Sequence, residues 1–258
     1  MGKNIVLLLC LIYAGDILGQ SVYIDRAIAA ADHERKRPLA EAIEYGFNGV
    51  SAEIELKKDG KLYCGSGTFR ERYLEPLLAR SNNGQAFIHP EHTDEFLLFL
   101  EVKSDSSTTY AALKKEIEPY HAMLTSFEGT RKTKKPVRLV LSGKVPHQVI
   151  YSESVRRVFC EDMANKLDQS HDGTYITVAS LKMKKLFDWK GEGTMPNMAY
   201  HSLGSYMKNA HKLGRWVRVY DLPEIPNAFD IIYEAGADYL EIKDLKNFSE
   251  YWKKRKPY

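Results

Sequence analysis

Three acidic residues and one lysine lie near the ends of two predicted strands, where their side chains could take part in catalysis or metal binding. Glu53 and Glu55 alternate along an apolar stretch at residues 49–56, and Glu101 and Lys103 end an apolar run that begins at residue 96. Successive strand residues point to opposite faces, so Glu53 and Glu55 share one face. Carboxylates between apolar neighbours need a partner, which water, a lysine or a divalent cation could provide.

Histidines are the other candidates for chemistry near neutral pH. His33 lies in Asp32-His33-Glu34-Arg35, where Asp32 or Glu34 could orient its ring. The alternative is that His33 is a solvated loop residue. His89 and His92 could serve as a replacement acid or as a metal-binding pair, although most histidines in so polar a loop are solvated.

The elements that must position these groups follow from apolar runs, helical spacing and the placement of glycine and proline. A hairpin turn is predicted at Asp59-Gly60. The stretch at 175–180 is either a strand or the start of a helix-rich connection. Predicted strands cover residues 28–31, 50–56, 96–102, 137–141, 155–160, 175–180, 216–220 and 239–242, and predicted helices cover 38–45, 69–80, 110–124, 197–213, 228–235 and 245–254.

Size and composition agree with one catalytic or binding domain. About eight strands alternating with helices predict a single (β/α)8 TIM barrel. The 258 residues, 44% of them hydrophobic, are enough for such a core. A net charge of +3 is too mild to indicate a nucleic-acid-binding protein. The basic runs at 131–135 and 253–256 are typical of solvated loops or tails.

The N-terminus has the layout of a secretory signal peptide. Lys3 precedes an apolar run at residues 5–14, and small residues follow around Gly15 and Gly19. We therefore expect residues 1–20 to be a signal peptide, residues 21–258 to be the mature domain, and the protein to be secreted or periplasmic. No stable membrane anchor is expected. After removal of the signal, Cys64 and Cys160 remain, and the sequence leaves open whether they pair.

Short motifs follow one another along the chain in a distinctive order. They are Pro38-Leu39, Gly46-Phe47, Glu53-x-Glu55, Asp59-Gly60-x-Leu62, Leu100-Glu101-Val-Lys103, Val140-Leu-Ser-Gly143, Trp189-x-Gly-Glu-Gly193, Ala210-His-x-x-Gly214, Val217-Arg-Val and Gly236-Ala-Asp238. This order resembles the phospholipase-C-like phosphodiesterases, which include the glycerophosphodiester phosphodiesterases, and within them the Aim6-related branch. The resemblance implies a TIM barrel that hydrolyses a phosphoric diester, with a small phosphodiester or a phospholipid headgroup as ligand.

The resemblance also implies a divalent cation at the carboxyl ends of the strands. Its ligands would be Glu53, Glu55 and Glu101, with Lys103 beside them, and such oxygen ligands suit Mg²⁺ or Ca²⁺. Glu55 stands where the family has an aspartate. The alternative is an ion pair of Lys103 with Glu53 or Glu101, without metal.

The family's two catalytic histidines are the main departure. The expected positions hold Ala30 and Ser66, and neither side chain can replace an imidazole. His33, three residues beyond the first position, could take over through a loop rearrangement. Without it we expect very slow hydrolysis, or a catalytically inactive barrel that binds a phosphate- or sugar-bearing ligand.

Three further residues are candidates for substrate binding. Trp189 and Tyr220 could stack on a headgroup or a sugar, or could be packing residues. Arg218 could meet a phosphate or pair with Asp221 or Glu241, and its place inside an apolar strand favours a paired guanidinium facing the barrel.

Overall fold

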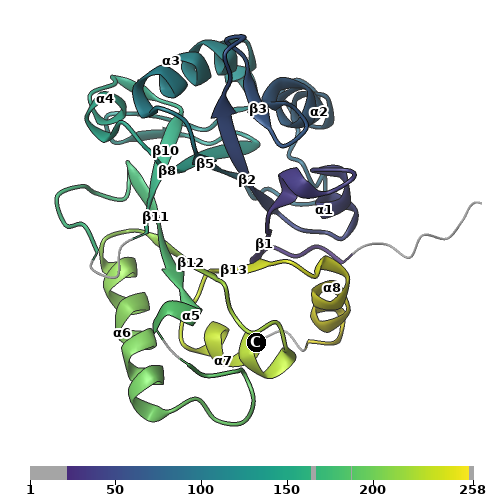
Figure 1. Ribbon diagram of the computed structural model, residues 1–258, viewed down its shortest axis with the longest axis vertical. Helices are drawn as coiled ribbons and strands as arrows, with labels where there is room; N and C mark the ends of the chain where they lie inside the picture. The colour runs from purple at the N-terminus through teal and green to yellow at the C-terminus, as the bar shows by residue number, and fades with distance from the viewer. Residues whose placement is uncertain (1–21, 164–166, 187, 256–258) are drawn as a thin grey trace, which may run out of the picture.

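Parallel strands form a closed barrel in the computed structural model, which describes residues 22–163, 167–186 and 188–255 (Figure 1). Within these residues the strand order is β1-β13-β12-β11-β10-β8-β5-β2, and pairing of β1 with β2 closes the ring. The predicted TIM barrel is therefore confirmed. Its strands are β1 (Ala27–Ala29), β2 (Gly49–Leu56), β5 (Phe96–Val102), β8 (Val137–Gly143), β10 (Val158–Asp162), β11 (Ile176–Lys182), β12 (Trp216–Tyr220) and β13 (Tyr239–Ile242).

Helices surround the barrel on the outside (Figure 1). Two of them adjoin helical turns of another type. A π-helical turn, η2 (Arg70–Leu74), directly precedes α2, and a 3-10 helix, η3 (Glu118–Met123), directly follows α3. A short 3-10 turn, η1 (Asp32–Glu34), follows β1. The helices are α1 (Ala40–Glu44), α2 (Glu75–Arg80), α3 (Ser106–Ile117), α4 (His147–Tyr151), α5 (Met183–Leu186), α6 (Asn197–Lys212), α7 (Pro226–Glu234) and α8 (Leu245–Lys254).

Apolar side chains fill two separate layers. A small buried cluster, formed by Ile28, Leu97, Phe99, Val140 and Val178, lies on the strand faces that point toward the barrel axis. A much larger cluster occupies the space between the strands and the surrounding helices. Strands buried on both faces read as continuous apolar runs, which is why residues 96–102 and 137–141 were recognisable in the sequence.

Two predicted elements differ from the structure by more than two residues at an end. The helix predicted at 110–124 begins at Ser106, because the Asp105 side chain caps it by accepting the Thr108 N–H at 3.0 Å. The strand predicted at 155–160 is wrong as a single element. Its first part, β9 (Val155–Arg156), joins an antiparallel sheet with β6 (Ser126–Glu128) and β7 (Arg131–Thr133), and only β10 enters the barrel.

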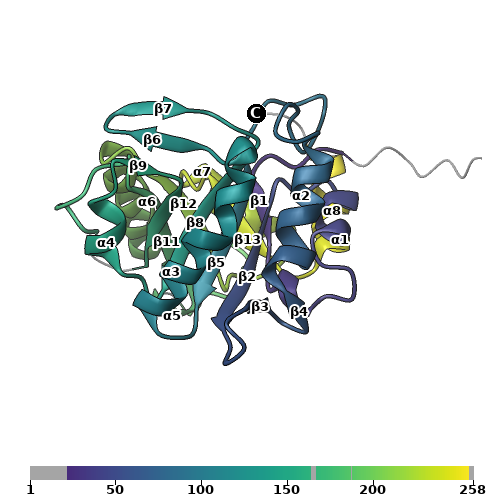
Figure 2. The ribbon, with the colours of Figure 1, turned by 90° about the horizontal axis from the view of Figure 1, so that it is seen from above.

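The two ends of the barrel carry different attachments (Figure 2). The small sheet of β6, β7 and β9 lies at the amino ends of the strands. A hairpin of β3 (Leu62–Cys64) and β4 (Gly67–Thr68) extends β2 at the carboxyl end. The turn before β3 is where the sequence placed it, but only Gly60, with φ 79°, adopts the left-handed region there, and Asp59 does not.

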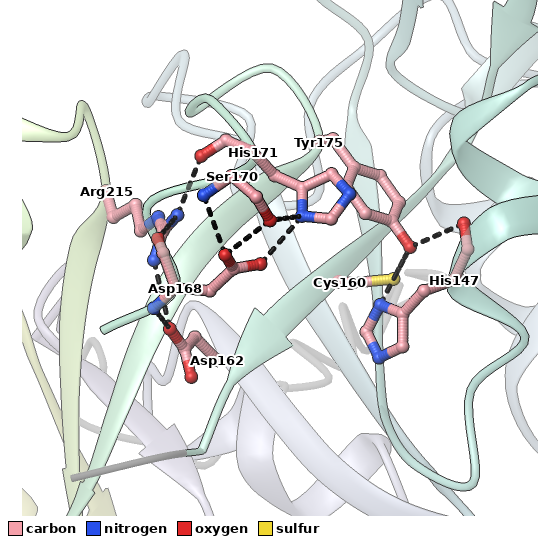
Figure 3. Close-up of polar contacts among 8 residues, drawn as sticks. All are labelled: His147, Cys160, Asp162, Asp168, Ser170, His171, Tyr175 and Arg215. Carbon is pink, nitrogen blue, oxygen red and sulfur yellow. Dashed lines mark hydrogen bonds and ion pairs between the residues drawn. The ribbon is translucent and has the colours of Figure 1, made fainter. Parts of the chain in front are cut away.

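The connection from β10 to β11 is held by polar contacts rather than by a helix in its described residues, 167–175 (Figure 3). The side chain of Arg215, which precedes β12, is fully buried and donates to Asp162 Oδ2 at 3.0 Å. It also donates to the main-chain carbonyls of Asp168 and His171, at 2.5 and 2.8 Å. One guanidinium thus fastens the end of β10 to the connection that follows it.

The predicted signal peptide, residues 1–20, lies outside the described residues. Across the described part of the chain, no helix is long and apolar enough to cross a membrane.

Candidate active site

A cavity of about 150 Å³ opens at the carboxyl ends of the strands. Register places Glu53 of β2 directly beside Glu101 of β5, so both carboxylates reach the same opening. Barrel enzymes place their chemistry at this end of the fold. The cavity is lined by Ala31, His33, Ser51, Ala52, Glu53, Phe99, Glu101, Ser142, Met163, Arg218, Tyr220 and Glu241.

Lys103 bridges two of the cavity's carboxylates, those of Glu53 and Glu101. Its Nζ lies 2.9 Å from Glu53 Oε1 and 2.8 Å from Glu101 Oε1. Hydrogen bonds to Glu101 and then to Glu53 raise the pKa of Lys103, so the lysine is fully charged at neutral pH. The geometry is that of the ion-pair alternative.

Glu55, the third predicted ligand, does not join them. It is exposed, lies two residues further along β2, and is not part of the cavity lining. Among the described residues, no group of three or more His, Cys, Asp or Glu side chains is arranged to hold a metal ion. A hard divalent cation needs several converging oxygens. As Lys103 already holds both cavity carboxylates, the residues present do not fit such an ion without rearrangement.

His33 lies on η1, directly after β1, and its ring faces the cavity. Only 10% of its side chain is exposed, so it is not a solvated loop residue. Its Nδ1 accepts the main-chain N–H of Glu53 at 3.2 Å, which places the hydrogen of the neutral ring on Nε2. That Nε2 lies 3.9 Å from Glu53 Oε2 and 3.9 Å from Glu34 Oε1. His33 thus presents a hydrogen-bond donor to the site.

The β3–β4 hairpin fixes the main chain of His33 from the other side. Gly65, with φ +63°, lies so close that a Cβ there would be 2.4 Å from the His33 carbonyl oxygen. Of the positions where the family has its histidines, Ala30 is buried and Ser66 is exposed, with its Oγ accepting from Arg72 Nη1 at 3.2 Å. His33 has therefore taken a place at the cavity that neither of them fills.

Arg218 forms the floor of the cavity and is paired, as its apolar strand predicted. It contacts Glu241 Oε2 at 2.5 Å, Glu161 Oε2 at 2.8 Å and Ser180 Oγ at 3.0 Å. Its guanidinium also lies 4.4 Å from the centre of the Phe99 ring. Because these carboxylates surround it, Arg218 supports the floor and is not a free phosphate ligand.

Glu161, which pairs with Arg218 beneath the cavity, is a residue that the sequence analysis did not single out. Burial raises its pKa, and the Arg218 guanidinium opposes that shift. The available signal was an acid near the carboxyl end of a predicted apolar strand, the same signal that identified Glu101. Asp221, the other partner considered for Arg218, instead lies 3.5 Å from Lys182.

The remaining candidates divide between the cavity and distant positions. Tyr220 lines the cavity, whereas Trp189 does not and donates from Nε1 to the Glu192 carbonyl at 2.9 Å. His89 binds the Phe47 carbonyl at 3.0 Å and His92 stacks on Tyr23, both at the amino end of the barrel. These two histidines cannot serve the cavity.

The two cysteines within the described residues are separate, free and buried. Burial raises the pKa of the Cys160 thiol to about 12, so the thiol stays protonated at neutral pH. The pairing that the sequence left open does not occur in this structure.

Comparison with known proteins connects this site to a family. A family model described as the AIM6-like phosphodiesterase domain matches residues 20–162. The chain is 26% identical, over 85% of its length and 67% of the relative's, to altered inheritance of mitochondria protein 6 from Eremothecium gossypii.

Solved structures agree at the level of the fold. A glycerophosphodiester phosphodiesterase from Agrobacterium tumefaciens superposes with a TM-score of 0.51 at 12% identity, over 89% of this chain and 100% of that one. A protein from Galdieria sulphuraria that is assigned as a glycerophosphodiester phosphodiesterase superposes with a TM-score of 0.54 at 13% identity. The superposition covers 89% of this chain and 99% of that one. With the family model covering more than half of the sequence, this chain belongs to the AIM6-like phosphodiesterase domain family.

Proposed function

We propose that the barrel mouth hydrolyses a phosphodiester and that His33 serves the reaction in place of the family's histidines. The observation that carries this proposal is the position of the His33 ring. Its Nε2 lies 3.9 Å from Glu53 Oε2, inside the cavity that Glu101 also lines. An imidazole this close to the carboxylates can act directly or through one water molecule.

The groups of the cavity divide the reaction between them. Glu53 takes the proton of the attacking water or substrate hydroxyl as the new P–O bond forms. The bond from phosphorus to the departing alcohol breaks, and the Nε2–H of His33 donates to the oxygen on which charge develops. Lys103 stabilises the charge on the phosphoryl oxygens. Solvent then protonates the departing oxygen and takes the proton back from Glu53.

Charge at the cavity supports a particular kind of substrate. Three carboxylates line it, namely Glu53, Glu101 and Glu241, against the two cations Lys103 and Arg218 that pair with them. A simple phosphodiester anion is disfavoured by this negative excess. A phosphodiester whose alcohol carries a positive charge, such as a choline or ethanolamine headgroup, is favoured. Tyr220, which lines the cavity and already has the Arg218 guanidinium 5.4 Å from its ring centre, supplies an aromatic ring beside such a group.

No step of this proposal passes through a metal ion, because Lys103 holds the two carboxylates that would face one. Dependence on Mg²⁺ or Ca²⁺ stays a prediction, as does export of the protein.

The test is turnover of glycerophosphocholine, glycerophosphoethanolamine and a glycerophosphodiester whose second alcohol carries no charge, by the wild type and His33→Ala. We expect slow but saturable hydrolysis that prefers the cationic headgroups. His33→Ala should lower kcat by roughly 10²- to 10³-fold, the range for losing one hydrogen-bond donor to an oxygen on which charge develops. His92→Ala, at the other end of the barrel, is the matched control and should keep the rate.

An alternative is that the barrel binds such a ligand without turning it over, which the replacement of both family histidines by Ala30 and Ser66 favours. Calorimetric binding of glycerophosphocholine to a wild-type protein that shows no hydrolysis would establish it. Equal turnover by wild type and His33→Ala would reject the role of His33 while leaving a hydrolase.

A further inference from the structure

Asp32 is a completely buried acid next to His33, yet its carboxylate does not orient the imidazole ring. It turns into the barrel wall, where Oδ2 accepts the main-chain N–H of Leu39 at 2.7 Å and the Tyr73 O–H at 2.9 Å. Both donors lie outside the cavity. The carboxylate therefore ties the segment at 31–39, which carries His33, to its own far end and to η2.

The segment is strained at both of its ends. Ala31 has φ 47° and ψ 41°, and Leu39 has φ 61° and ψ −52°. A residue with a Cβ reaches positive φ only at a penalty of about 1–3 kcal/mol, and such a conformation persists when the surroundings enforce it. The Asp32 bond to the Leu39 N–H enforces one end. The bond of the Ala31 N–H to Ser51 Oγ, at 3.3 Å, enforces the other.

Arg35 strengthens the same arrangement. Its Nε lies 3.9 Å from Asp32 Oδ1, and its Nη2 donates to the Ala30 carbonyl at 3.3 Å and to the Lys243 carbonyl at 2.8 Å. The segment is thereby attached to the ends of β1 and β13. These contacts hold the main chain of His33 in place. They thereby also place the His33 ring, whose Nδ1 accepts the Glu53 N–H.

We propose that Asp32 is a positioning residue, which sets the His33 ring in the cavity by clamping the segment at 31–39 through Leu39 and Tyr73. The activity part of this proposal rests on the function proposed above. The placement of the His33 ring does not depend on that function, and it can be measured separately.

Two substitutions separate the clamp from the charge. Asp32→Asn keeps a carbonyl oxygen where Oδ2 lies and so can accept both hydrogen bonds, whereas Asp32→Ala loses them. The amide changes only the oxygen that faces Arg35 at 3.9 Å, so Asp32→Asn should destabilise the fold less than Asp32→Ala does. We expect Asp32→Asn to retain turnover and Asp32→Ala to lower kcat by roughly 10²-fold, the scale of a 1 Å misplacement.

The double variant Asp32→Ala/His33→Ala should be no slower than His33→Ala alone, because Asp32 acts only through the ring. Additive losses in the double variant would overturn the proposal, as would full activity in Asp32→Ala. Tyr73→Phe removes one of the two bonds and should give an intermediate rate. If Asp32→Ala does not fold, Tyr73→Phe takes its place in the activity test.

The ring itself is followed by ¹⁵N NMR of the labelled protein. Wild type and Asp32→Asn should show His33 as one tautomer, with the hydrogen on Nε2, because Nδ1 accepts the Glu53 N–H. Asp32→Ala, or Tyr73→Phe in its place, should show a mixture of tautomers. An unchanged His33 spectrum in both would overturn the clamp. If His33→Ala keeps the wild-type rate, the proposed function fails, and the spectrum still decides the role of Asp32.

Discussion

Lys103 contacts the same two carboxylates that the sequence offered as ligands of a divalent cation. The sequence allowed Glu53 and Glu101 to hold either a divalent cation or a lysine, and the ammonium lies between them. Both carboxylates and the lysine are 40–47% exposed, so solvent screens the pair. Pairs of this kind contribute about 0–1 kcal/mol to stability. Their effect is on what else can bind, rather than on the free energy of unfolding.

Lys103→Met should therefore change stability little and should expose two carboxylates to metal. At a hundredfold excess of Ca²⁺ or Mg²⁺ over Kd, binding would stabilise this variant by about 2.7 kcal/mol, a rise in Tm of roughly 5–10 °C. Wild-type Tm should stay flat across the same titration. Lys144→Met, on the loop after β8, is the matched control and should also stay flat. A metal-dependent rise in wild-type Tm would show that the ion displaces Lys103.

At the scale of elements, the connection from β10 to β11 replaces helix packing with polar contacts (Figure 3). In most of the barrel an apolar helix face covers the strands. Here Arg215 reaches three oxygen acceptors from a fully buried position, and Ser170 and His171 bond to Asp168 on the surface of the same connection. Order in this stretch should depend on the guanidinium more than on apolar burial.

Arg215→Met should lower the free energy of unfolding by about 3–5 kcal/mol, the scale of breaking a buried ion pair from one side. Arg215→Lys should recover only part of that, since an ammonium cannot reach all three acceptors at once. Chemical denaturation of each variant measures the change. Arg157→Met removes a partly exposed pair with Glu118, at 3.7 Å, and should change stability by less than about 1 kcal/mol. Equal effects at both positions would contradict this account.

At the scale of the molecule, the two ends of the barrel have different tasks. The carboxyl end holds the cavity, and the amino end carries the small sheet of β6, β7 and β9 (Figure 2). Buried Glu95 joins that sheet to the barrel, with Lys132 of β7 at 2.6 Å and Arg138 of β8 at 2.8 Å. Burial pushes the pKa of Glu95 upward, but Arg138, Lys132 and Thr125 outweigh it and leave the pKa below its usual value.

A carboxylate with a depressed pKa in the folded state stabilises the fold above its unfolded pKa, near 4.5, and this contribution is lost as pH falls through the folded value. Tm should therefore decrease below about pH 4.5. Glu95→Gln should lower stability at pH 7 by about 3–5 kcal/mol and should weaken the pH dependence below 4.5. Glu128→Gln, exposed on β6, is the control. A pH profile for Glu95→Gln that parallels wild type would contradict the assignment.

The sequence by itself determined the barrel and most of its elements. Buried parallel strands are continuous apolar runs, so 96–102, 216–220 and 239–242 were placed to the residue, and glycines at Gly46 and Gly214 marked helix ends. The strand predicted at 155–160 failed because local pattern cannot say which sheet a short strand joins. Motif order also led to the family and to Glu53, Glu101 and Lys103.

Only the tertiary structure decided where the candidate residues lie and what they contact. Register put Glu53 beside Glu101, and the ammonium of Lys103 lies 2.9 and 2.8 Å from the two carboxylates. The direction of a loop after β1 brought His33 into the cavity, and that direction depends on Asp32 reaching Leu39 and Tyr73. Contacts between residues far apart in the chain leave no pattern in a single sequence, because neither spacing nor composition encodes which side chains meet.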